Sequence, residues 1–320
     1  MSCPQALVLN NIGGGIGVRV EKFPAINESV MIKAMEPPGE DLAKGGNVAV
    51  AMSRLGVHCA IIGKIGLDEA GDRDYGWMKG AGVDLSALIR TNEVRTGQGI
   101  GITADSGDVM LFTGLSSSWA LTFEEVEIAM RRYKDAQYFL TGFEIRPSLV
   151  LPAAQLAKEL GMKTVLNPSP IPSEGLSEIP FIDFLFVNEI EACRLLDIEI
   201  VRDFDQRKVC EDLKKRYRCP NVIVTIGDKG SCYSDENNDF QFIPAIPVCC
   251  IDSAGAGDGY MACVISKLIQ GNTLIDACQY ASAFAAYSVT KVDCLPGYPS
   301  PSILEAFLQE HESNLQRKSL

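Results

Sequence analysis

The sequence has 320 residues, of which 47% are hydrophobic and 22% charged, so it can bury a large core and is not a disordered chain. Its formal net charge of −12, from 29 lysines and arginines against 41 aspartates and glutamates, excludes a broad basic surface for nucleic acid or an anionic membrane. A polyanion such as a nucleotide must therefore be bound by a local arrangement of donors.

The cysteines and histidines indicate the compartment of the protein and argue against some kinds of site. Eleven cysteines are scattered along the chain, and the start MSCPQALVLNN has no basic region before an apolar stretch. The sequence has no run of about 18 apolar residues, the length needed to span a bilayer. We therefore expect a cytoplasmic protein with free thiols. The two histidines, His58 and His311, argue against a histidine-based zinc site or a Ser-His-Asp triad.

Short β-rich runs followed by helical patterns set the rhythm of the chain. In chain order the pattern predicts a strand at 5–12, a helix at 46–56, a strand at 58–64, helices at 68–81 and 122–133, a strand at 136–141, a helix at 148–160, strands at 162–167 and 184–187, helices at 189–196 and 205–217, a strand at 221–226, and helices at 257–270 and 273–291. This alternation indicates βαβ units and a parallel sheet.

Two segments break this rhythm, at about 18–36 and 95–114, and both have the alternation of antiparallel strands outside the main sheet. They form either a small β-lid or two ordinary edge hairpins. The apolar side chains that they would present away from the main sheet include Val18, Val20, Ile100, Ile102 and Phe112.

The strongest chemical signal is the stretch IDSAGAGD at 251–258, which is followed by an apolar run. Its small residues permit a tight turn whose N–H groups face one point, and the helix beginning there adds free N–H groups and a positive dipole end. This combination suits a phosphate. Asp258 in the first helical turn could accept the proton of an attacking hydroxyl. The alternative is an ordinary loop and helix start, but the full DxxGxGD pattern favours function.

The DSAGAGD stretch resembles the C-terminal signature of the ribokinase-like sugar kinases, the PfkB family. Further blocks follow the order of that family: KGGNVA at 44–49 with RLG at 54–56, GKIGLDEAG at 63–71, NEIE at 188–191 and TIGDKG at 225–230. The resemblance covers about residues 5–308. It implies a single ribokinase-like α/β domain over 1–320, with a central, mostly parallel sheet flanked by helices on both faces and a small β-strand lid.

The resemblance also implies the reaction, the transfer of the γ-phosphoryl group of ATP to a hydroxymethyl group of a small sugar. The residues expected to act in catalysis are Asp258 as the base, with Gly255, Ala256 and Gly257 stabilising charge through their N–H groups. The residues expected to contact ATP are Asn188, Thr225, Gly227 and Gly230. From the residues alone, 225–230 is equally a turn that ends a strand.

Sugar and metal contacts follow from the same resemblance. The residues expected to bind the sugar are Lys44, Gly45, Gly46, Asn47, Glu144 and Asp258. Glu191 is expected to hold Mg²⁺ through water, and Asp252 to belong to a monovalent-cation loop with 288–297. The alternatives are a capping box for Asn188 and Glu191, a strand–helix turn at 45–47 with Asn47 as the cap, and a solvated loop carboxylate for Glu144.

One departure concerns the substrate. Family members usually carry an aspartate after the first strand that grips two sugar hydroxyls, but NNIGGGIG at 10–17 has no acid. We therefore expect D-ribose to be a poor substrate, unless another acid such as Asp41 replaces the missing one. Nucleosides and keto-sugar acids are the alternative substrates. A non-catalytic nucleotide- or sugar-sensing protein is the alternative of another class, against which Asp258 argues. The resemblance also implies a homodimer through the lids.

Overall fold

The computed structural model describes residues 3–36, 39–106, 109–112, 117–173, 175–199 and 205–318. Its centre is a nine-stranded sheet in the order β13-β12-β11-β10-β9-β8-β1-β4-β5. The strands are β1 (Ala6–Leu9), β4 (Cys59–Gly66), β5 (Leu88–Thr91), β8 (Tyr138–Gly142), β9 (Lys163–Asn167), β10 (Phe184–Asn188), β11 (Asn221–Thr225), β12 (Gly230–Ser234) and β13 (Phe240–Pro244). From β11 to β5 all neighbours are parallel, and β12 and β13 add an antiparallel edge.

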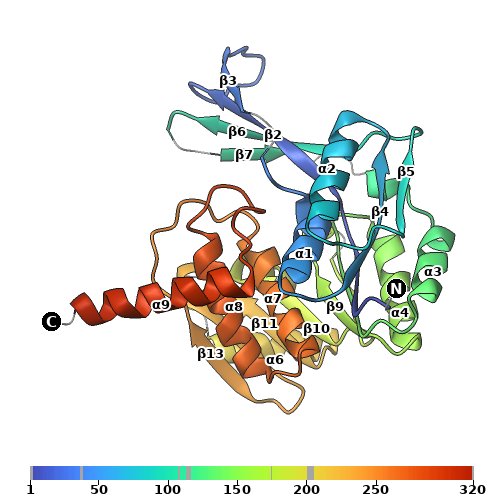
Figure 1. Cartoon of the computed structure of the whole chain (residues 1–320), viewed down its shortest axis with the longest axis vertical. Coiled ribbons are helices and arrows are strands. Elements are labelled where there is room, and N and C mark those ends of the chain that lie inside the picture. Colours follow the sequence, from blue (N-terminus) through green and yellow to red (C-terminus); the bar gives the residue numbers. More distant parts are fainter. Residues whose placement is uncertain are drawn as a thin grey trace.

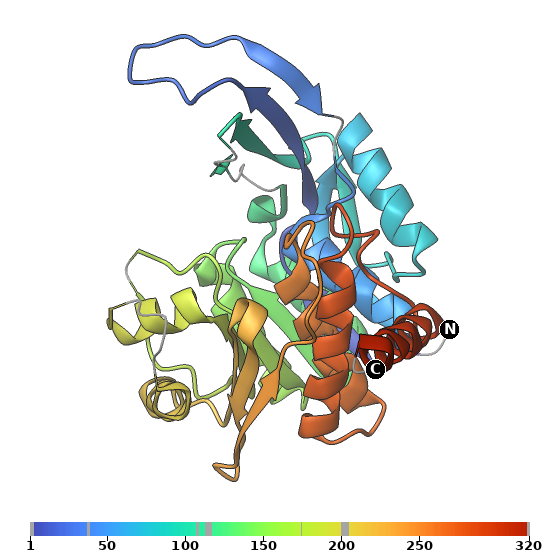
Figure 2. The same cartoon turned by 90° about the vertical axis from the view of Figure 1, so that its left-hand side faces the viewer.

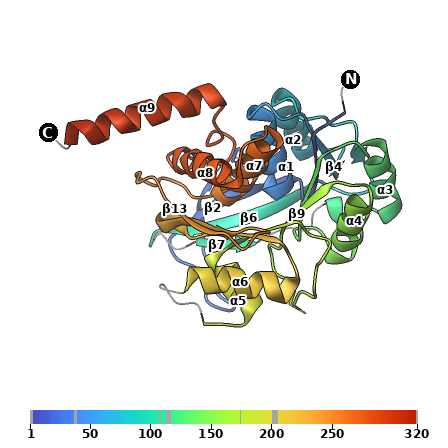
Figure 3. The ribbon, with the colours of Figure 1, turned by 90° about the horizontal axis from the view of Figure 1, so that it is seen from below.

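Helices cover both faces of this sheet, as expected, and Figure 3 shows them as separate layers. One face carries α1 (Ala43–Arg54), α2 (Glu69–Gly80), α7 (Ala256–Ile269), α8 (Leu274–Ser288) and α9 (Pro301–Lys318). The other carries α3 (Phe123–Arg132), α4 (Pro147–Glu159), α5 (Glu189–Leu196) and α6 (Gln206–Tyr217). Alternate side chains of each strand enter opposite cores: Val8 lies with the first group and Leu7 with the second.

The four strands β2 (Gly13–Val20), β3 (Ile32–Glu36), β6 (Gly97–Ala104) and β7 (Val109–Phe112) form a second sheet in the order β3-β2-β6-β7. This sheet, the lid, stands off the main body (Figures 1 and 2). The β2–β3 and β6–β7 pairs are antiparallel, as predicted, but β2 and β6 pair in parallel. Residues 107–108 and 113–114 of the expected lid lie outside the described residues.

Two expectations about the lid were wrong. The lid begins earlier than the expected position of about residue 18, because β2 already starts at Gly13. Gly13 pairs with Gly97, and a β-carbon there would lie 2.3 Å from the Gly97 carbonyl oxygen, so the close pairing of these strands requires glycine. Val20 is buried rather than presented on an apolar lid face.

No helix within the described part of the chain is long and apolar enough to cross a membrane. All eleven cysteines are free, as expected, and eight of them are buried.

Candidate active site

The carboxyl ends of the parallel strands meet at one edge of the main sheet, where ligands bind in open α/β folds. β10 and β11 end there at Asn188 and Thr225, while α1 and α7 begin nearby. A single cavity brings together six of the residues predicted from the sequence: Lys44, Asn188, Glu191, Thr225, Gly257 and Asp258. These residues come from four parts of the chain, namely α1, the β10–α5 junction, β11 and the start of α7, which only folding brings together.

The turn before α7 is built around Gly255. Its φ of 68° lies in the left-handed region, and a β-carbon would lie 2.5 Å from both the Cys294 sulfur and the Tyr298 hydroxyl oxygen. The Tyr298 hydroxyl donates a hydrogen bond to the Gly255 carbonyl oxygen at 2.9 Å. Asp258 follows in the first turn of α7 and is only 8% exposed. The turn therefore places this carboxylate beside the positive end of the helix.

Lys44 connects the two carboxylates expected to meet the sugar. Its ammonium group donates to Oδ1 of Asp258 at 3.2 Å, and its backbone N–H donates to Oε2 of Glu144 at 3.1 Å. Burial lowers the pKa of Lys44, but the charges of Asp258, Glu144 and Glu191 outweigh it and the pKa rises, so this ammonium group stays protonated. Burial raises the pKa of Glu144 to about 7 against the opposing charge of Lys44.

The start of α1 is tightly packed. Gly45 donates its N–H to the Asn11 carbonyl oxygen at 2.9 Å, and a β-carbon at Gly45 would lie 2.4 Å from that oxygen. The amide of Asn47 accepts from the Leu42 N–H at 3.0 Å and donates to Oδ1 of Asp41 at 2.8 Å. Asn47 is buried, and Leu42, not Asn47, is the N-cap of α1. A sugar contact through Asn47 stays a prediction.

Asp41 lies in the same neighbourhood. Its Oδ1 also accepts from the Ala43 N–H at 2.9 Å. Burial raises the pKa of Asp41, the hydrogen bond from Asn47 opposes this, and the negative charge of Asp258 adds to the rise. An acid absent from the first loop is therefore present at the start of α1, within the electrostatic reach of the expected base.

Asn188 and Glu191 form the capping box that the residues alone suggested. Oδ1 of Asn188 accepts from the Glu191 N–H at 2.8 Å, and Oε2 of Glu191 accepts from the Asn188 N–H at 2.9 Å. Both residues nevertheless line the cavity. Asn167 lines it too, and its Oδ1 is buried with no hydrogen-bond partner among the described residues. This side of the cavity thus offers oxygen acceptors to a ligand.

The segment 225–230 combines a strand end with a turn. The Thr225 hydroxyl lies 3.5 Å from the Val187 carbonyl oxygen, a distance too long for a strong hydrogen bond, and Thr225 lines the cavity. A β-carbon at Gly230, with its φ of 122°, would lie 2.1 Å from the Ile243 carbonyl oxygen. Pairing of β12 with β13 therefore requires this glycine whatever it binds. Gly227 and Gly230 lie outside the cavity lining that the structure describes.

Asp252 joins the two segments expected to form a cation loop. Its Oδ1 accepts from the Ala254 N–H at 2.9 Å and its Oδ2 from the Asp293 N–H at 3.0 Å. The Val289 carbonyl oxygen accepts from both Ile251 and Asp252. The structure thus brings 251–254 and 288–297 together, and cation binding there stays a prediction.

Sequence patterns did not predict the contacts of Tyr298 and Cys294, which pack against Gly255 from about 40 residues away. Burial raises the pKa of the Cys294 thiol, as do the nearby carboxylates of Asp41 and Asp258. Neither residue type has a pattern that links it to a phosphate-binding turn. Only the fold identifies them as supports of this turn.

The chain is an open α/β protein with a β-lid and a buried aspartate at a helix N-terminus, and comparison with known proteins identifies its family. The family model described as pfkB family carbohydrate kinase matches residues 44–301. The chain therefore belongs to the pfkB family, and the expected enzyme class, a carbohydrate kinase, is confirmed.

Curated relatives include the ribokinase of Staphylococcus aureus, 27% identical over 281 residues that cover 83% of this chain and 91% of the relative. The deoxyribokinase of Salmonella typhi is 26% identical over 271 residues, which cover 84% and 88%. Among solved structures, Arabidopsis thaliana ribokinase complexed with ribose and ATP has a TM-score of 0.82 at 22% identity, covering 96% of this chain and 99% of that one. Giardia lamblia ribokinase has a TM-score of 0.84 at 20% identity, covering 97% and 99%. The ribokinase-like fold is thus confirmed.

Proposed function

We propose that this carbohydrate kinase transfers the γ-phosphoryl group of ATP to a hydroxymethyl group of a small sugar of the pentose class. The observation that carries the proposal is the buried Asp258 in the first turn of α7, in one cavity with Lys44, Asn188, Glu191 and Thr225. The similarity to relatives named ribokinase and deoxyribokinase supports a pentose.

The chemistry follows from the positions of these groups. Asp258 accepts the proton of the attacking sugar hydroxyl, and the N–H groups at the start of α7 stabilise charge on the transferring phosphoryl group. Lys44 keeps its positive charge beside Asp258 and lines the same cavity, so it can offset negative charge on the phosphoryl group. Phosphoryl transfer needs mainly positioning and charge stabilisation, which these groups supply.

The side-chain oxygens of Asn188 and Glu191 fit Mg²⁺, which kinases use to neutralise the ATP phosphates. Mg²⁺ keeps most of its waters and needs few protein ligands. Glu191 and Asn188 would hold the hydrated ion, and the unpartnered Oδ1 of Asn167 is an acceptor for a water or a phosphate-bound group in the same cavity. For a monovalent cation, we keep Asp252 as the candidate, because it joins the two loops expected to bind one.

The proposal also covers the domain organisation, the oligomeric state and the location of the protein. The chain works as one domain over 1–320 with its lid, and copies pair through the lids into a homodimer. Eleven free cysteines fit a reducing compartment, the cytoplasm. The exposed apolar residues of the lid include Ile32, Met35, Ile100, Met110 and Phe112.

A phosphorylation screen with ATP and Mg²⁺ over pentoses, hexoses, keto-sugar acids and nucleosides tests the function. The proposal expects the highest turnover with a pentose, and turnover about 10²- to 10⁴-fold lower in Asp258→Asn. Preference for a nucleoside or a keto-sugar acid would replace the substrate class. Binding of ATP and sugar without phosphorylation would instead indicate a sensing protein.

A further inference from the structure

The loop after β8 carries Glu144, and the chain around 119–121 contacts this loop twice, at the backbone of Glu144 and at the side chain of Arg146. The indole N–H of Trp119 donates to the Glu144 carbonyl oxygen at 2.7 Å. Two residues further on, the Arg146 guanidinium group donates to the Leu121 carbonyl oxygen. One segment therefore contacts the loop at Glu144 itself and two residues beyond it. Trp119 belongs to the short 3₁₀ helix η1 (Ser117–Ala120), which precedes α3.

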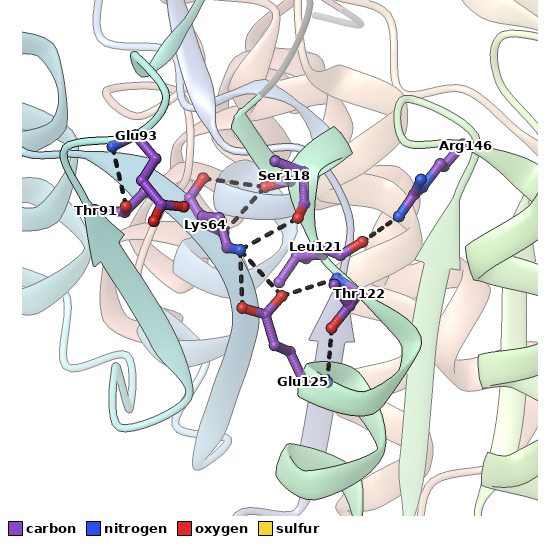
Figure 4. Close-up of polar contacts among 9 residues, drawn as sticks. Lys64, Thr91, Glu93, Ser118, Leu121, Thr122, Glu125 and Arg146 are labelled. Atoms are coloured by element: carbon purple, nitrogen blue, oxygen red, sulfur yellow. Dashed lines mark hydrogen bonds and ion pairs between the residues drawn. The ribbon is translucent and has the colours of Figure 1, made fainter.

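Lys64 of β4 fixes η1 in turn, as Figure 4 shows. Its ammonium group donates to the Ala120 carbonyl oxygen at 3.2 Å, and its backbone N–H donates to the Ser118 hydroxyl oxygen at 3.2 Å. The Ser117 hydroxyl donates to the Lys64 carbonyl oxygen. One strand residue thus contacts η1 through its side chain and through both backbone groups.

The Lys64 ammonium group also meets a carboxylate at the start of α3. It donates to Oε1 and Oε2 of Glu125 at 2.9 and 3.0 Å, and Lys64 is only 7% exposed. Glu125 completes a capping box with Thr122 (Figure 4). Burial raises the pKa of Glu125, but the hydrogen bonds from Lys64 and Thr122 outweigh it, and the pKa falls. Glu125 therefore stays ionised at neutral pH, and its two contacts with the Lys64 ammonium group tie η1 and α3 to β4 of the main sheet.

On the other side, Glu144 is held by Lys44. Oε2 of Glu144 accepts from the Lys44 N–H at 3.1 Å. Trp119 therefore fixes the backbone of Glu144 while α1 fixes its carboxylate. A site built in this way is sensitive to shifts well below 1 Å, because binding groups act only when held close to the productive geometry.

We propose that Trp119 is a positioning residue for the sugar-binding carboxylate of Glu144, and that the Lys64–Glu125 pair anchors the segment carrying Trp119. This rests on the proposed function, since it takes Glu144 as a sugar contact. Trp119 acts through its one N–H donor, so phenylalanine removes the action and keeps most of the ring.

The decisive variant is Trp119→Phe, measured with D-ribose varied at saturating ATP. We expect the KM for ribose to rise about 3- to 10-fold, with kcat within about twofold and the KM for ATP unchanged. Ribose binding by calorimetry should weaken by the same factor. The matched control is Phe123→Leu, an aromatic residue with the same 39% exposure as Trp119, which should behave as wild type.

A double-mutant cycle separates positioning from general damage. In a Glu144→Gln background, Trp119→Phe should add less than about twofold to the ribose KM, because its route of action is already lost. An equal effect in both backgrounds, or an unchanged KM in the single variant, would overturn the role of Trp119. A fall in kcat together with a higher KM for ATP would also overturn it.

The anchor is tested by Lys64→Met, which loses the hydrogen bonds to Ala120 and Glu125, with Lys64→Arg as the variant that keeps the charge. We expect the same rise in the ribose KM in the first and a partial return toward wild type in the second. An unchanged KM in folded Lys64→Met would overturn the anchoring role. If the wild-type chain phosphorylates no sugar of the panel, the proposed function itself fails; wild-type activity with an inert Trp119→Phe removes this inference alone.

Discussion

At the scale of single residues, the ion pair between Lys44 and Asp258 joins positions 214 apart in the sequence. Their side chains are 24% and 10% exposed, so water screens the pair only partly. Breaking such a pair leaves a charge without its partner. If Asp258 is the base, as we propose, a phosphate bound at the start of α7 would offer Lys44 a second anionic partner and leave the Asp258 carboxylate able to accept a proton.

Asp258→Asn removes the proposed base while keeping the shape of the side chain. Turnover should fall by about 10²- to 10⁴-fold, with the fold and ATP binding retained. Steady-state kinetics, with circular dichroism and ATP titration, measure both. Asp276→Asn is the matched control, because Asp276 stands in the first turn of the neighbouring helix α8 but is exposed. Near-normal turnover in Asp258→Asn would contradict the assignment.

Asp41 is the acid that could replace, in ribose binding, the aspartate that is missing from residues 10–17. We expect D-ribose to be a poor substrate, with a high KM, unless the Asp41 carboxylate accepts its hydroxyls. Where it does, Asp41→Ala costs roughly 1.5–3 kcal/mol per charged hydrogen bond, or about a tenfold to hundredfold higher ribose KM. Glu40→Ala, an exposed neighbouring acid, should change nothing. Efficient ribose turnover that ignores Asp41→Ala would show that both alternatives are wrong.

The raised pKa of Glu144 predicts that the stability of the fold depends on pH. Its pKa of about 7 in the fold lies above the ordinary value of 4.5, so the folded protein binds this proton more tightly than the unfolded chain. Ionising Glu144 therefore destabilises the fold as pH rises from about 4.5 to about 7, and the loss stays constant above that range. Glu144→Gln should raise the Tm by roughly 2–5 °C at pH 8 and by almost nothing at pH 4. An equal gain at both pH values would exclude this cause.

At the scale of elements, the sequence predicted the strands that are buried on both faces and the helices that cover them, because their apolar runs are unambiguous. The strands β5, β12 and β13 were not predicted. They lie at or next to the sheet edges, and β13 (FQFIP) contains a glutamine and ends at a proline, so its pattern resembles a loop. The helix α9 was not predicted either.

The candidate site shows the same division. The resemblance of the motifs to the family predicted Asp258, Lys44, Asn188 and Thr225 as site residues, and they do meet in one cavity. It could not predict Trp119, because a lone indole that hydrogen-bonds a backbone carbonyl leaves no pattern in a sequence. Contacts of this kind exist only once β4, η1 and the loop after β8 are in place.

The turn before α7 provides a prediction at this scale. Gly255→Ala adds a β-carbon at a φ of 68° and 2.5 Å from two buried side-chain atoms, so both strain and a clash oppose it. We expect a loss of roughly 2–4 kcal/mol of stability and a large fall in turnover. Gly271→Ala is the control, because its φ of 86° is similar but nothing lies within 4 Å of the added carbon. Equal stability losses in both variants would assign the effect to strain alone.

At the scale of the whole molecule, the lid presents a continuous apolar face to the outside. Ile100 pairs with Phe112 and Ile102 with Met110, so these side chains lie on one side of the lid sheet. Ile100, Met110 and Phe112 are 44%, 41% and 52% exposed, and Met35 of β3 is 65% exposed. Exposed apolar surface of this extent on a thin sheet is typical of an interface.

We therefore expect a homodimer in which the lids of two copies pack together. Light scattering at micromolar concentration should give twice the mass of the chain for the wild type. The double variant Ile100→Glu, Phe112→Glu should give the mass of a single chain. The matched control is Ile128→Glu on α3, which changes a similarly exposed isoleucine far from the lid, at 64% exposure, and should leave the dimer intact. Because each lid then loses the partner that covers its apolar face, the monomeric variant should also bind sugar more weakly. A wild-type monomer at micromolar concentration would contradict the prediction, and so would a dimer that survives both lid charges.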